Sequence, residues 1–88
     1  MNKVTAELLI EAKRQVESEG WRARSYSLHF LHWLRIKDHD LADCDGPESQ
    51  KWFAGLEVNV GPMQPMLSYD GPAGIGQNFI DLETGDRF

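Results

Sequence analysis

Side chains in the first twenty residues recur with the period of an α-helix. On a helical wheel, six of them fall within one arc of about 140°: Val4, Thr5, Leu8, Leu9, Ala12 and Val16. Thr5 is placed as the N-cap, and Gly20 as the residue that ends the helix. The pattern predicts an amphipathic helix over residues 6–19, and Ile10 points away from its apolar face.

A near-strict alternation of large and other side chains follows over residues 26–36. This period of two is typical of a half-buried strand, and we therefore predict one long strand here. Leu31 and Trp33 lie on its second face, which must then be covered by a helix or meet another chain. A helix with Leu28, Leu31 and Leu34 on one side is the less favoured alternative.

The remaining pattern predicts shorter elements. Residues 38–50 read as an acidic loop with Gly46 and Pro47, and residues 47–54 as a short helix that carries Trp52 and Phe53. Alternating apolar positions then predict three strands, separated by turns rich in glycine and proline, at residues 56–60, 66–69 and 78–82.

These elements predict an α+β fold. The N-terminal amphipathic helix packs on a small, mainly antiparallel sheet of three to four strands, with a short second helix. With 88 residues, the chain is expected to form a single small domain, 1–88.

Charge is distributed unevenly along the chain. The net charge is −5, but residues 1–37 carry +3 and residues 38–88 carry −8. Five of the ten acids in the second part fall within eleven residues of the predicted loop: Asp38, Asp40, Asp43, Asp45 and Glu48. Such a surface could attract a basic partner.

The composition excludes several classes of protein. Cys44 is the single cysteine, so no internal disulfide can form, and a reducing compartment is expected. No apolar run approaches the roughly 18 residues of a membrane span, and the first residues do not resemble a signal peptide. We expect a cytoplasmic protein, in the host cytoplasm if the chain is viral.

No set of residues indicates catalysis or metal binding. The acids of the loop do not have the spacing of a calcium loop, and one cysteine does not make a zinc site. On the predicted strand, His29 and His32 point to opposite faces and cannot share a ligand. We therefore predict no enzymatic activity, no cofactor and no metal; a small enzyme that uses either histidine with a carboxylate is a minor alternative.

In size, acidity and lack of a motif, the chain is similar to the small inhibitors that phages encode against host defences, anti-CRISPR proteins among them. We predict a non-enzymatic protein-binding module of the inhibitor type, whose partner is a host protein, such as a basic nucleic-acid-binding protein. With a pI near 5.0, direct nucleic-acid binding is not expected. Tryptophan and tyrosine often anchor interfaces, and Trp33, Trp52 and Tyr69 are expected to be exposed. The candidate partner-binding residues are Asp38, Asp40, Asp43, Asp45, Glu48, Leu31, Trp33 and Trp52.

An alternative is a small-ligand or nucleotide-binding oligomer. Trp21, Tyr26 and Trp33 would supply the surfaces on which the ligand stacks. The helix followed by Gly20, Trp21 and a strand is loosely similar to phage proteins that sequester nucleotide signals. A homodimer would also explain the apolar second face of the predicted long strand.

Overall fold

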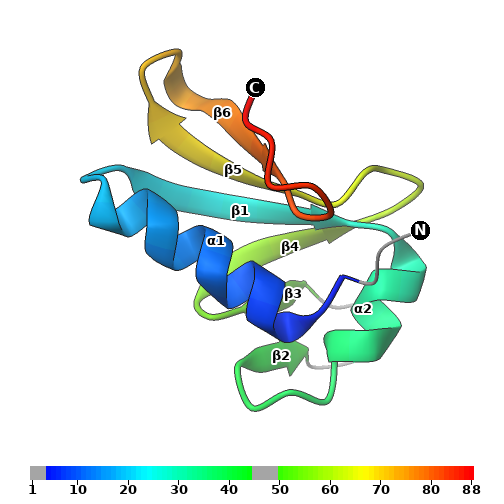
Figure 1. Ribbon diagram of the computed structural model, residues 1–88. Coiled ribbons are helices and arrows are strands. Elements are labelled where there is room, and N and C mark those ends of the chain that lie inside the picture. Colours follow the sequence, from blue (N-terminus) through cyan, green and yellow to red (C-terminus); the bar gives the residue numbers. More distant parts are fainter. Residues whose placement is uncertain (1–3, 45–49) are drawn as a thin grey trace.

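The computed structural model describes residues 4–44 and 50–88, which form two helices and one mixed sheet of six strands (Figure 1). The elements are α1 (Ala6–Ser18), β1 (Arg22–Leu28), α2 (Phe30–Ile36), β2 (Ala42–Cys44), β3 (Lys51–Phe53), β4 (Leu56–Val60), β5 (Met66–Gly71) and β6 (Gly74–Asp81). The strand order is β2-β3-β4-β1-β5-β6. The predicted α+β class is confirmed.

Helix α1 begins and ends at the predicted signals. The Thr5 hydroxyl accepts a hydrogen bond from the Leu8 N–H at 3.3 Å, as an N-cap does. At the other end, Gly20 has a φ of +85°, and the Trp21 N–H donates to the carbonyl of Val16 at 3.1 Å. A glycine in the left-handed region lets the chain leave the helix and satisfies a terminal carbonyl.

Strand β1 is the centre of the sheet. It pairs parallel with β4 and antiparallel with β5, whereas the other neighbouring strands are all antiparallel. Tyr26 and Leu28 on one face are fully buried, and Ser25 and Ser27 on the other face are half-buried. This alternation means that only one face of the sheet needs a cover.

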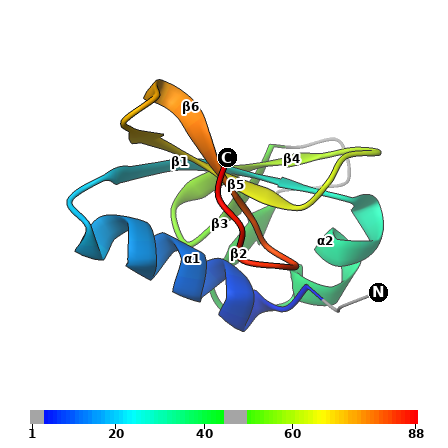
Figure 2. The same ribbon diagram turned by 45° about the horizontal axis from the view of Figure 1, so that its top comes forward.

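Both helices lie on the same side of the central strands, and the core fills the space between (Figure 2). The largest fully buried side chains come from both layers: Leu9 and Val16 of α1, Tyr26 and Leu28 of β1, Ile36 of α2, Phe53 of β3 and Leu67 of β5. Neither helix of the described ranges is long and apolar enough to cross a membrane.

The predicted long strand over residues 26–36 is wrong, because β1 stops at Leu28 and α2 starts at Phe30. A single residue, His29, lies between the strand and the helix. Its Nδ1 accepts a hydrogen bond from the Leu31 N–H at 3.2 Å, so His29 is the N-cap of α2. His32, Trp33 and Ile36 form the buried side of α2. Because this short helix has apolar residues on both its buried and its exposed side, its sequence resembles the alternation of a strand.

The short helix predicted over 47–54 is also wrong where the structure describes it. Trp52 and Phe53 belong to β3, which joins β4 through a tight turn at Ala54 and Gly55. Both turn residues have positive φ values, +52° and +80°. Such a two-residue turn matches the twist of an antiparallel hairpin, whereas residues 47–49 lie outside the described ranges.

The sheet is larger than the predicted three to four strands, and its parallel β1–β4 pair makes it mixed. Much of the segment expected as a loop before residue 78 is the first half of β6. Asp70 fastens this hairpin, since its Oδ1 accepts from the Gly76 N–H and from Arg24 Nε, both at 2.8 Å. The three-residue strand β2, within the predicted acidic loop, adds the other edge of the sheet.

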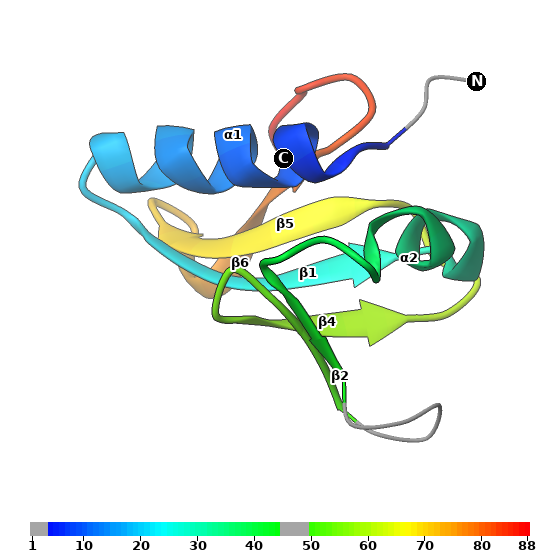
Figure 3. The ribbon, with the colours of Figure 1, turned by 90° about the horizontal axis from the view of Figure 1, so that it is seen from below.

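The C-terminal residues return along the molecule. Phe88 exchanges two backbone hydrogen bonds with Phe79 of β6, and the Arg87 guanidinium pairs with Glu19 just beyond α1. This segment lies beside α1 in Figure 3, which also shows β2 turned away from the direction of the central strands. One edge of the sheet is thus partly covered by the chain's own end.

The burial of Trp33 gives a first prediction. Replacing Trp33 with alanine should lower the free energy of unfolding by about 3–5 kcal/mol, because it removes a large core side chain. Urea unfolding followed by circular dichroism measures this. Trp52→Ala is the matched control at an exposed tryptophan, and its loss should stay below about 1 kcal/mol. Equal losses would contradict the placement of the two rings.

Candidate protein-binding surface

The predicted partner-binding residues do not form one surface in the structure. Asp40, Asp43 and Trp52 line one groove together. Asp38 lies near the end of α2, where its carboxylate is 3.3 Å from Lys37 Nζ, and Leu31 is exposed on α2. Asp45 and Glu48 lie outside the described residues.

The groove lies between α1 and the β2–β3 hairpin, and its volume is about 1030 Å³. It is the space left where α1, which packs against β1 and β5, does not reach the far end of the sheet. Its apolar lining consists of Ile10, Leu41, Ala42, Trp52 and Ala54. Trp52 is 42% exposed and Leu41 is 44% exposed, so both present apolar area to solvent.

Two features shape the hairpin side of the groove: the register of the β2–β3 pairing and the contacts of His39. Asp43 stands opposite Trp52 in the β2–β3 pairing, so acid and aromatic ring are neighbours. His39 Nδ1 accepts a hydrogen bond from the Leu41 N–H at 3.1 Å, and its ring centre lies 5.4 Å from that of Phe53. These contacts anchor the turn that carries Asp40 and Leu41 to the core.

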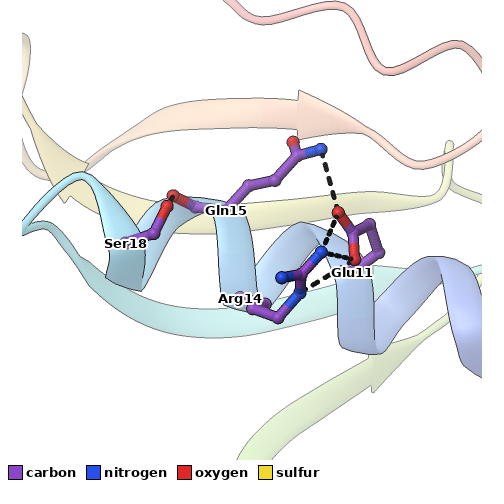
Figure 4. A network of polar contacts seen from close by, with 4 residues as sticks. All are labelled: Glu11, Arg14, Gln15 and Ser18. Carbon is purple, nitrogen blue, oxygen red and sulfur yellow. Dashed lines mark hydrogen bonds and ion pairs between the residues drawn. The ribbon is translucent and has the colours of Figure 1, made fainter.

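On the helix wall, charges are cancelled locally. Arg14 binds both carboxylate oxygens of Glu11, at 2.7 and 2.8 Å through one nitrogen, and Gln15 approaches the same carboxylate (Figure 4). Lys13 Nζ lies 3.1 Å from Glu17. The arginine hydrogen bonds lower the pKa of the Glu11 carboxyl. Exposed pairs of this kind stabilise the fold little, but they leave this wall without a strong charge.

The aspartates on the opposite wall are not cancelled in this way. Within the described part of the chain, neither Asp40 nor Asp43 has an ion-pair partner. The groove therefore combines apolar lining residues, one exposed tryptophan and, on the hairpin side, two carboxylates without an ion-pair partner among the described residues.

Sequence reasoning missed several groove residues. Ile10 did carry a signal, because the helical wheel points it away from the apolar face of α1, and among the described residues it is the apolar side chain of α1 that lines the groove. Leu41 and Ala54 gave no such signal, since their role depends on a hairpin that the sequence pattern did not reveal.

Two expected interface aromatics are core residues. Trp33 and Tyr69 are buried, which contradicts their predicted exposure, whereas the exposure of Trp52 is confirmed. Trp33 and Tyr26 are both buried, so neither offers the stacking surface that a nucleotide-binding alternative would use. Trp21 remains as the one exposed ring of that predicted trio.

His29 and His32 lie on neighbouring turns, with ring centres 6.1 Å apart, so the expectation of opposite strand faces is wrong. His32 is buried, and its Nδ1 has no hydrogen-bond partner within the described residues. Burial lowers the pKa of His32, against an opposing effect of Glu83. In the described ranges, no three histidine, cysteine or acidic side chains are grouped so that they could hold a metal ion.

Comparisons with known proteins add no assignment. No family model, curated protein or solved structure matches the chain.

The buried His32 predicts a pH-dependent stability. A histidine whose folded pKa is lowered binds more protons in the unfolded chain, so stability falls as the pH drops below about 6.5 and levels off below the folded pKa. Unfolding by urea at pH 7.5 and 5.5 would measure the loss. His32→Phe should lose less stability over this interval, and the contribution of His39, which is present in both proteins, cancels. Equal losses in the two proteins would show that His32 does not cause the dependence.

Proposed function

We propose that the protein is a non-enzymatic protein-binding module of the inhibitor type, which binds its partner in the groove between α1 and the β2–β3 hairpin. The observation that carries the proposal is that exposed Trp52, several apolar side chains and the carboxylates of Asp40 and Asp43 line the same groove. Interfaces gain most of their affinity from buried aromatic anchors surrounded by polar groups.

The shape and chemistry of the groove favour a particular occupant. A helix wall and a hairpin wall border a partly apolar space, as in grooves that take the apolar face of a partner's helix. Asp40 and Asp43 would meet lysine or arginine side chains of that segment. A basic nucleic-acid-binding protein of the host is a partner of this chemistry.

The inhibitor role is proposed from the general character of the chain and not from the groove. It rests on the small size, the acidity and the lack of a catalytic motif, which the chain shares with phage-encoded inhibitors. Blocking requires only that the bound module cover a basic surface that the partner uses, so no catalytic group is needed.

Trp52 tests the groove directly. Immobilised wild-type protein should capture a partner from a cell lysate, and Trp52→Ala should lose it, because the anchor is removed while the fold remains. Ile75→Ala is the matched control, since Ile75 is 71% exposed on β6 and does not line the groove. Capture that survives Trp52→Ala but fails with Ile75→Ala would move the binding site to the other edge of the sheet.

The two aspartates test the electrostatic part. With the captured partner purified, the D40N/D43N variant should associate more slowly than wild type, and the difference should shrink as salt is added. The E7Q/D86N variant removes two exposed acids outside the groove and serves as the control of equal net charge. Surface plasmon resonance at two salt concentrations measures both rates; equal slowing in the two variants would show a net-charge effect without a groove.

A further inference from the structure

The outward side of α2 is unusually apolar for an exposed helix. Phe30, Leu31 and Leu34 are 53%, 57% and 43% exposed and lie on one side, whereas His32, Trp33 and Ile36 lie buried on the other. Arg35 is the one charged residue of α2 on this outward side, and it is exposed as well. Three exposed apolar side chains side by side on a short helix are typical of a surface that a partner covers. In the single chain, α2 is covered on one side only.

A hollow of about 560 Å³ adjoins these side chains. Phe30, Trp33, Leu34 and Val60 supply its apolar lining, and Lys37 and Asp38 stand at its border. Lys51 and Cys44 border it as well, and each already makes a contact of its own. Leu31 of the same helix does not line the hollow and is exposed, so α2 contributes both an exposed leucine and part of a hollow that could receive one.

The charges at this border differ from those of the groove. Lys37 and Asp38 form a loose pair at 3.3 Å, with side chains 44% and 88% exposed. Such a pair contributes little to stability and can exchange partners. If a second copy faces this surface in the opposite direction, its Asp38 meets Lys37 and its Lys37 meets Asp38, so the two surfaces are complementary in charge.

We propose that the α2 surface, defined as Phe30, Leu31, Leu34, Lys37 and Asp38, is the interface of a twofold homodimer. A twofold axis brings the same patch of both subunits together, so that each contact occurs twice. Leu31 of each copy enters the partner's hollow, and Lys37 of each copy faces the partner's Asp38. The α2 hollow and the binding groove share no lining residue, so a dimer keeps two open grooves and could hold a two-site target by avidity.

Sedimentation velocity over a range of concentrations tests the dimer. Wild-type protein should shift from the monomer to twice its mass, and Leu31→Arg should weaken the association by about tenfold or more, because it places a charge in an apolar contact. Ile75→Arg is the control at a position on β6 that is even more exposed than Leu31, and it should dimerise as wild type does. Circular dichroism verifies that both variants fold. A wild-type chain that stays monomeric at millimolar concentration overturns the proposal, as does equal dimerisation of the two variants.

A charge exchange tests the twofold arrangement. K37D and D38K should each dimerise weakly alone, because each places like charges opposite one another at both contacts. Mixed in equal amounts, the two variants should form a heterodimer close to wild type in affinity. No gain on mixing would contradict the paired contacts.

Discussion

Tyr26 holds the layers of this protein together. It lies in the central strand β1, is fully buried, and donates its hydroxyl hydrogen to the carbonyl of Leu9 in α1 at 2.8 Å. Its ring meets Phe53 of β3 edge-on, with centres 6.0 Å apart. A buried hydroxyl without a partner would be costly, so the position of α1 over the sheet is tied to this bond. Burial also raises the pKa of the phenol, which stays neutral and remains a donor.

The groove is a consequence of that anchorage. Because Tyr26 fixes α1 over β1 and its neighbour β5, the helix leaves the β2–β3 end of the sheet uncovered. Phe53 secures the hairpin from the core side, while Trp52, next in the strand, faces away from it. Of these two adjacent aromatic residues, Phe53 stabilises the fold, and Trp52 stays exposed, where we propose that it binds a partner.

Local signals in the sequence predicted part of this structure. Helix α1 was predictable, because its apolar period agrees with the Thr5 cap and the glycine stop. Helix α2 was not predictable. Its exposed Phe30, Leu31 and Leu34 hide the helical period of its apolar residues, and no glycine or proline separates it from β1. The acids of the groove were identified, but their assembly with Ile10 depends on contacts between distant segments. A single sequence carries no direct record of such contacts, and the burial of Trp33 was missed for the same reason.

We propose that partners bind between α1 and the β2–β3 hairpin. Hydrogen–deuterium exchange of the protein, alone and with its captured partner, maps the contact without any substitution. We expect slower exchange in the complex at the backbone amides around Ile10, Leu41 and Trp52, and unchanged exchange at the amides of β1 and β4. Slower exchange confined to β1, β4 or β6, with the groove amides unaffected, would place the partner elsewhere and overturn the proposal.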